Sequence, residues 1–166
     1  FVIGGGPCAY NPEPLAEFFD IFYIGEGETV YNELMDCYKI WKEKGGSRKE
    51  FLIEASKISG LYVPSLYEAT YHEDGRIKSF GPVEPEIPRK IKKQVVSDLS
   101  HTYYPSKPVV PFIKVTQDRV VLEIQRGCIR GCRFCQAGNV YRPNRERDLD
   151  FLKKYAHDML ISTGHE

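Results

Sequence analysis

Three of the five cysteines in this chain lie within eight residues, in the pattern C-x3-C-x2-C: Cys128, Cys132 and Cys135. They follow directly on the apolar run 120–125, which predicts a buried strand. In α/β folds, sites are commonly built in loops that follow the carboxyl end of a strand. Gly127 and Gly131 offer the backbone freedom that a tight loop needs. The pattern therefore predicts a loop that can bring three thiolates to one soft inorganic centre.

The spacing of the donors limits which centre this can be. A structural zinc site takes four protein ligands, commonly two C-x2-C pairs or a cysteine pair with a closely spaced histidine pair. The chain has one C-x2-C pair, and its four histidines are isolated from one another: His72, His101, His157 and His165. Three local thiolates suit a [4Fe–4S] cluster with one iron open to another ligand. A zinc site completed by a distant histidine or by a residue outside this sequence, and three free thiols, remain the alternatives.

The other two cysteines, Cys8 and Cys37, are interpreted as buried structural thiols. The count of five is odd, and the sequence does not start with a secretory signal. Both observations argue against a disulfide framework and favour a reducing compartment. We therefore expect a cytoplasmic protein. No apolar run approaches the roughly 18 residues of a membrane-spanning helix, so we expect no membrane partner.

Charge is distributed unevenly along the chain. Lys and Arg number 23, as do Asp and Glu, so the net charge is zero, which excludes a simple polybasic nucleic-acid-binding domain. Residues 1–36 contain seven acids and no base, whereas residues 126–154 contain eight bases and three acids. We interpret the acidic end as a solvated surface. Arginines beside the cysteines favour ionised thiols and offset the negative charge of a thiolate-bound cluster.

Two other interpretations of the basic segment stay open. In an interaction module whose cysteines bind zinc, the arginines would bind a phosphate or an acidic partner: Arg142, Arg145 and Arg147. Alternatively, the same arginines form an ordinary surface and pair with the neighbouring acids, Glu146, Asp148 and Asp150.

The first 60 residues predict alternating strands and helices. Strands are expected at 1–3 and 20–24, with a short helix between them that starts near Pro12, which makes a βαβ unit. A helix is expected from Thr29 to the glycines at 45–46. Ser47 and Glu50 have the spacing of a capping box for the next helix.

The rest of the chain changes character. Asp74-Gly75 between two alternating runs predicts a β-hairpin. Residues 81–111 contain six prolines and are expected to form a linker or a covering segment. Strands are expected over 112–125. Asp148 is the predicted N-cap of a last helix that stops at Thr163-Gly164.

The cysteine loop resembles the signature of the radical S-adenosylmethionine (SAM) superfamily, C-x3-C-x-aromatic-C, because Cys128, Cys132, Phe134 and Cys135 match each element. The resemblance implies a [4Fe–4S] cluster on the three cysteines, SAM on the open iron, and Phe134 beside the SAM adenine. It implies an Fe–S oxidoreductase that reductively cleaves SAM to a 5′-deoxyadenosyl radical, which abstracts hydrogen from a substrate. The implied electron donor is a flavodoxin or ferredoxin. The substrate is unknown, with nucleic acid left open.

The amino-terminal residues carry a second resemblance. Ile3-Gly4-Gly5-Gly6, Pro12-Glu13-Pro14 and the run 20–28, which ends in Gly-Glu-Gly-Glu, are similar to the last βαβ of a cobalamin-binding-type domain. An ordinary Rossmann-like edge unit is the alternative. The order of segments resembles the group of enzymes with a B12-binding domain before a radical SAM domain. The cobalamin-coordinating histidine motif would lie upstream of residue 1, so cobalamin as a cofactor is left open.

These resemblances predict an α/β chain in three parts. Residues 1–60 would be the end of the cobalamin-binding-type, Rossmann-like domain with trailing helices. Residues 61–111 would be a β-hairpin and Pro-rich linker, and residues 112–166 the first βα unit of a radical SAM (β/α) barrel. A full barrel needs on the order of 200 residues or more. We therefore expect a piece of a longer enzyme that does not cleave SAM by itself.

Overall fold

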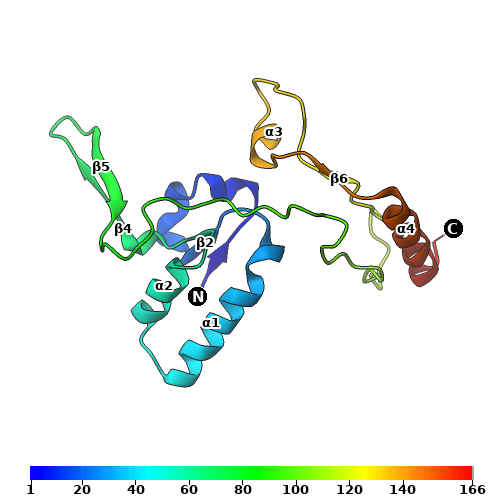
Figure 1. Cartoon of the computed structure of the whole chain (residues 1–166), viewed down its shortest axis with the longest axis horizontal. Helices are drawn as coiled ribbons and strands as arrows, with labels where there is room; N and C mark the ends of the chain where they lie inside the picture. Colours follow the sequence, from blue (N-terminus) through cyan, green and yellow to red (C-terminus); the bar gives the residue numbers. More distant parts are fainter. Residues whose placement is uncertain (166) are drawn as a thin grey trace. The chain divides into compact units, whose positions relative to one another are not determined.

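The computed structural model describes residues 1–165, and the chain divides into two compact units (Figure 1). The first unit is Phe1–Val95 and the second begins at Val96. The helices and strands of the first unit are β1 Ile3–Gly4, β2 Ile21–Tyr23, α1 Tyr31–Lys44, α2 Arg48–Ser56, β3 Leu61–Tyr62, β4 Tyr67–Tyr71 and β5 Ile77–Pro82. Those of the second are β6 Gln125–Arg126, α3 Ala137–Val140, β7 Arg145–Glu146 and α4 Leu149–Thr163. This content confirms the predicted α/β class.

The first unit is built on a small sheet in the order β1-β2-β3. β1 and β2 are parallel, as the predicted unit requires, and β3 is antiparallel to β2. The connection between the parallel strands contains two 3₁₀ helices, Pro7–Tyr10 and Glu13–Phe18, where we expected one short helix. Prolines at 7, 12 and 14 remove backbone donors, so the connection forms short 3₁₀ turns.

Apolar residues pack on both faces of this sheet. Successive residues of a strand point to opposite faces, so neighbouring residues belong to different clusters. Ile21 and Leu61 belong to the main core. The other buried residues of this core come from α1, α2 and other segments of the first unit: Val30, Leu34, Phe51, Leu52, Ala55, Ile58, Val63, Leu66 and Ile87. Phe22 and Tyr62 belong to a smaller cluster on the other face with Ala9. These strands of only two or three residues are thus stabilised by apolar packing on both faces of the sheet.

The predicted helix signals in this unit are confirmed. Gly45 ends α1 in the left-handed conformation, with φ of 68°. The Ser47 side chain accepts from the Glu50 amide, and the Glu50 carboxylate accepts from the Ser47 amide at 2.6 Å. These bonds satisfy amides that have no partner within the helix.

The predicted hairpin is confirmed as the antiparallel pair β4–β5, with Gly75 at φ of 81° in its turn. The segment after it covers the first unit. Ile87 is buried in the main core, and Gln94 makes a parallel bridge to Gly25. The Gln94 amide donates to the Ile24 carbonyl at 3.0 Å, and the Glu26 amide donates to the Gln94 carbonyl at 3.0 Å.

In the second unit, β6 and β7 form an antiparallel pair, and α4 ends at Gly164 as predicted. The Asp148 side chain caps α4 by accepting from the amides of Asp150 and Phe151, which confirms the predicted N-cap. The expectation of strands over 112–125 is wrong except at Gln125, where β6 begins. A strand needs a hydrogen-bonded neighbour. Within the described residues only β7 provides one, opposite Gln125 and Arg126.

Among residues 1–165, no helix combines the length and the hydrophobicity that crossing a membrane requires.

The bridge at Gly25 makes a sharp stability prediction. Gly25 has φ of 127°, and a Cβ there would lie 2.2 Å from the Gln94 carbonyl oxygen. We expect Gly25→Ala to lower the free energy of unfolding by about 1–3 kcal/mol, because it adds both backbone strain and a backbone clash. Denaturant titration followed by the fluorescence of the single tryptophan, Trp41, measures this in the first unit. Gly5→Ala is the matched control, because a Cβ at Gly5 meets nothing within 4 Å. Equal stabilities of the two variants would contradict the prediction.

Candidate functional site

The three clustered cysteines lie in one long loop of the second unit, residues 127–144, which we call the cysteine loop. β6 enters the loop and β7 leaves it, with Gln125 opposite Glu146 and Arg126 opposite Arg145. The short helix α3 lies within it (Figure 1). The predicted order of strand, cysteine-bearing turn and helix is therefore present, although both strands are two residues long.

Two of the three sulfur atoms already accept hydrogen bonds from backbone amides. The Arg130 amide donates to Cys128 Sγ at 3.4 Å, and the Gly138 amide donates to Cys135 Sγ at 3.4 Å. Cys128 and Cys135 are half-buried, whereas Cys132 is exposed. Amide donors to sulfur stabilise thiolates and tune the potential of a cluster that they bind. The backbone of the cysteine loop thus already donates hydrogen bonds to the sulfurs of Cys128 and Cys135.

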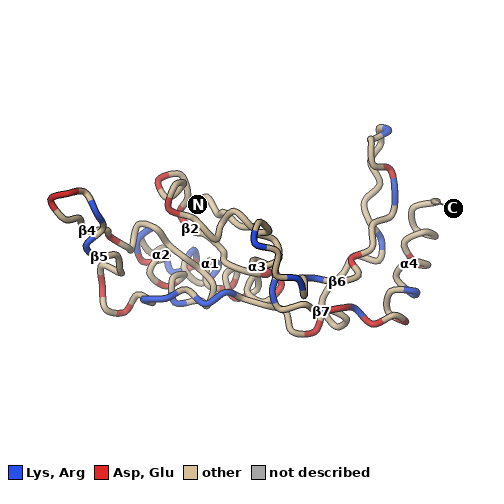
Figure 2. Tube along the Cα trace, turned by 90° about the horizontal axis from the view of Figure 1, so that it is seen from above, with Lys and Arg blue, Asp and Glu red and all other residues tan. Residues whose placement is uncertain are grey.

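A hollow of about 230 Å³ lies beside the sulfurs. The residues that line it include Cys132 and Cys135 together with Arg130, Arg133, Arg142 and Asn139. Basic residues follow the chain around α3, β6 and β7 (Figure 2). The combination of soft sulfur donors and positive charge fits an anionic, thiolate-bound iron–sulfur centre in its donor chemistry.

The thiols themselves do not converge. Within residues 1–165, no three His, Cys, Asp or Glu side chains gather as a metal-binding group. Phe134 is 91% exposed. The ligand roles of Cys128, Cys132 and Cys135, and the position of Phe134 beside adenine, therefore stay predictions.

The two glycines of the motif play different parts. Gly127 has φ of 91°, and a Cβ on it would lie 2.6 Å from the carbonyl oxygens of both Tyr141 and Pro143. Gly127 is therefore needed where the two arms of the loop approach each other. Gly131 has no positive φ and has open space around it, so the expectation that it permits a tight turn is wrong.

The prediction for the other two cysteines is wrong for one of them. Cys8 is exposed, because it lies in the 3₁₀ turn Pro7–Tyr10, in which only Ala9 is buried. Cys37 is half-buried and packs against the main core. Burial and the nearby carboxylates of Glu54 and Glu33 raise the pKa of the Cys37 thiol. A groove of about 1060 Å³ between α1 and α2 includes Cys37, but it lies in the first unit and contains no second cysteine.

The alternative that the arginines after the cysteines form an ordinary surface is wrong for Arg147. The Arg147 side chain is fully buried, and its Nη2 donates to Glu123 Oε2 at 2.5 Å. Its Nη1 donates to the Leu99 carbonyl. Arg145 donates to the backbone carbonyls of Val96, Pro143 and Tyr141 at 2.5, 3.0 and 3.3 Å.

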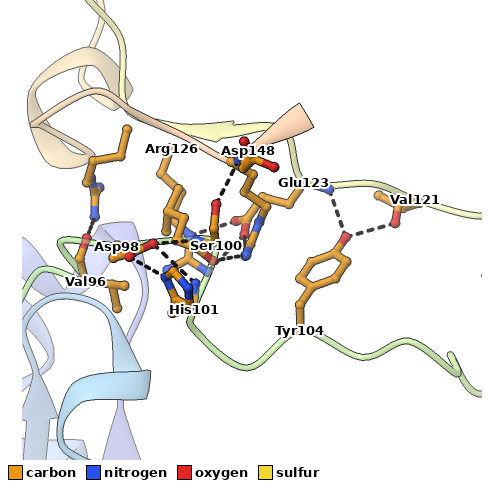
Figure 3. Close-up of polar contacts among 12 residues, drawn as sticks. Val96, Asp98, Ser100, His101, Tyr104, Val121, Glu123, Arg126 and Asp148 are labelled. Carbon is orange, nitrogen blue, oxygen red and sulfur yellow. Dashed lines mark hydrogen bonds and ion pairs between the residues drawn. The ribbon is translucent and has the colours of Figure 1, made fainter. Parts of the chain in front are cut away.

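Glu123 is the acid at the centre of this arrangement, beside Arg126 (Figure 3). Arg126 Nε donates to Glu123 Oε1 at 2.7 Å. Burial tends to raise the pKa of Glu123, but hydrogen bonds from Arg126 and Arg147 outweigh burial and hold that pKa below its ordinary value. The Glu123 amide donates to the Tyr104 hydroxyl at 2.8 Å, and this hydroxyl donates to the Val121 carbonyl at 3.0 Å.

Sequence reasoning missed both Glu123 and Tyr104. Glu123 is the one acid in the apolar run 120–125, and an acid in such a run signals a basic partner elsewhere. Tyr104 lies in the Pro-rich segment, where no local pattern marks it.

One comparison with known proteins relates the amino-terminal part of the chain to radical SAM proteins. Residues 1–64 match the family described as radical SAM proteins, N-terminal. The chain is also 32% identical over 159 residues to an uncharacterized protein of Methanocaldococcus jannaschii. That match takes in 94% of this chain, which spans only 28% of the length of that relative. No solved structure matches the chain.

The low pKa of Glu123 predicts an acid-sensitive second unit. A carboxyl group whose pKa is lowered by folding stabilises the fold above its ordinary pKa, about 4.3. This contribution is lost as the pH falls from there through the lower folded value. We therefore expect Glu123→Gln to be less stable than wild type at pH 7 but to lose less stability between pH 6 and pH 3. Amide hydrogen exchange of residues 96–165 measures both. Parallel pH profiles for the two proteins would contradict the prediction.

The two motif glycines provide a matched pair of variants. We expect Gly127→Ala to loosen the cysteine loop, because its Cβ would push against the carbonyls of Tyr141 and Pro143. Gly131→Ala should leave the loop unchanged. Hydrogen exchange of the amides in 127–144 should rise in the first variant alone. A similar rise in both variants would mean that the close approach at Gly127 does not hold the loop.

Proposed function

We propose that this chain is the cluster-binding part of a radical SAM iron–sulfur enzyme, with Cys128, Cys132 and Cys135 as the ligands of a [4Fe–4S] cluster. The observation that carries the proposal is the cysteine loop between β6 and β7, in which backbone amides donate to two of the three sulfurs. The relation of residues 1–64 to the amino-terminal part of radical SAM proteins supports it independently, because the cysteines lie outside that match.

When bound, the cluster supplies the one-electron reduction that cleaves SAM to a 5′-deoxyadenosyl radical, which abstracts hydrogen from a substrate. The chain's own residues contribute position and charge. Cysteine thiolates are the donors, and amides at 130 and 138 stabilise negative charge on sulfur. Arg130, Arg133 and Arg142 line the same hollow as Cys132 and Cys135, which gives an anion a positive surrounding.

The wider organisation belongs to the same proposal. Residues 1–60 would be the end of a cobalamin-binding-type domain, 61–111 a hairpin and linker, and 112–166 the start of the radical SAM barrel. Phe134 would then meet the SAM adenine, and its 91% exposure leaves the ring accessible for that contact. Cleavage of SAM, with an electron donor such as a flavodoxin or ferredoxin in the cytoplasm, would be an activity of the whole protein.

Anaerobic reconstitution with iron and sulfide tests the proposal. We expect the full-length protein to take up close to four irons and to gain a broad absorption band near 400 nm, as thiolate-bound clusters do. Cys132→Ser should lose most of the bound iron. Cys37→Ser and Cys8→Ser are the matched controls, because neither residue lies in the cysteine loop. A colourless protein with stoichiometric zinc would instead favour the zinc-binding interaction module.

A further inference from the structure

We propose that Arg147, clamped by Glu123, is a positioning residue that holds the cysteine loop in the shape needed to present its three ligands. This inference rests on the proposed function, because it concerns how the cluster ligands are placed. It assigns to Arg147 a role that differs from gripping a phosphate or an acidic partner, since its guanidinium is turned inward.

The loop needs such a clamp because its strands are too short to close it. Two residue pairs, Gln125 with Glu146 and Arg126 with Arg145, form the whole β6–β7 ladder. One further backbone bond, from the Arg147 amide to the Ile124 carbonyl at 2.9 Å, extends it. A two-stranded ladder is marginally stable in water even when it is longer than this. Closing a loop the length of 127–144 also costs chain entropy.

The clamp spans both arms of the loop. Glu123 precedes β6 and holds Arg126 on the same arm, at 2.7 Å. It also holds Arg147, which follows β7 on the other arm, at 2.5 Å. One carboxylate therefore ties the strand that leads into Cys128 to the strand that leaves the loop.

Because Arg147 is buried, its charge requires the contact with Glu123. The Arg147 side chain has no exposed surface. The Tyr104 ring lies over its guanidinium at 4.6 Å, and the Phe151 ring lies at 5.4 Å. Its Nε has no hydrogen-bond partner among the described residues. A charge this buried is tolerated only with a paired counter-charge, so losing Glu123 would displace the guanidinium.

Two more arginines extend the clamp into the loop through backbone carbonyls. Arg142 donates to the Arg130 carbonyl at 3.0 Å, across the hollow beside the sulfurs. Arg145 donates to the carbonyls of Tyr141 and Pro143, which face Gly127. The rigid fork of a guanidinium can hold several carbonyls at once, which an ammonium group does less well. The arginines after the cysteines thus act as braces of the loop backbone.

Hydrogen exchange and iron release in the full-length protein test the inference with separate readouts. The variants are Glu123→Gln, which keeps the side chain's size, and Arg147→Lys, which keeps the charge but loses the fork. Arg76→Lys is the matched control, because Arg76 forms an exposed ion pair with Asp74 in the hairpin of the first unit. In metal-free protein, amide exchange of 127–144 should rise about tenfold in Glu123→Gln, less in Arg147→Lys, and not in the control.

After reconstitution, the same order is expected in the rate at which a chelator removes iron, again about tenfold for Glu123→Gln. The reduced cluster's electron paramagnetic resonance spectrum should also change in this variant, which a general loss of stability would not produce. Loops that exchange at the wild-type rate would overturn the inference, and so would faster exchange with unchanged iron release and spectrum. If the wild type itself takes up no iron, the proposed function fails, and the inference fails with it.

Discussion

A guanidinium without exposed surface is the constraint on which the second unit depends. Arg147 can be buried because Glu123 neutralises it, the Leu99 carbonyl accepts from it and the Tyr104 ring covers it. Apolar side chains could not substitute for these contacts, because a buried charge loses its hydration and must regain it from the protein. The partners come from two separate stretches of the chain, around 99–104 and at 123, so satisfying this one group also brings those stretches together.

Each unit is stabilised by a different kind of interaction. The first has a continuous apolar cluster of eleven buried residues that α1, α2 and the sheet share. The second buries few large apolar side chains, among them Leu99, Leu152 and Met159. Much of its order comes from hydrogen bonds between arginines and carbonyls. Such bonds are directional, whereas apolar burial is not.

Directional bonding suits the task proposed for the cysteine loop. A cluster ligand must be held within a fraction of an ångström, and loops gain that precision only from the contacts that brace them. The amides that donate to Cys128 and Cys135 belong to the same braced backbone. The arginines therefore have two roles. They hold the loop by donating hydrogen bonds to backbone carbonyls, and they line the hollow next to the sulfurs.

The glycine-rich run after β2 shows how a motif can acquire another explanation. Gly25 begins the run that made the amino-terminal part similar to a cobalamin-binding-type domain. In the structure, Gly25 accommodates the backbone of Gln94, which passes too close for any side chain. This use of the glycine is structural and needs no ligand, and it is separate from the proposed origin of the domain.

What the sequence determined by itself was local. The cap of α2 at Ser47, the stop of α1 at Gly45, the hairpin turn at Gly75 and the cap of α4 at Asp148 all involve groups a few residues apart. The cysteine spacing is local in the same sense, and it carries most of the functional proposal. Short-range geometry follows from residue type, so a reader of the sequence can predict it.

Only the tertiary structure decided the rest. Arg147 meets Glu123 across 24 residues and Leu99 across 48, and no local pattern specifies such pairs. The same holds for residues 112–124, whose apolar side chains favour a strand but find no neighbouring strand in the described chain. The exposure of Cys8 likewise depends on its surroundings in the fold. Burial and pairing are properties of the surroundings of a residue, and those surroundings come from distant parts of the chain.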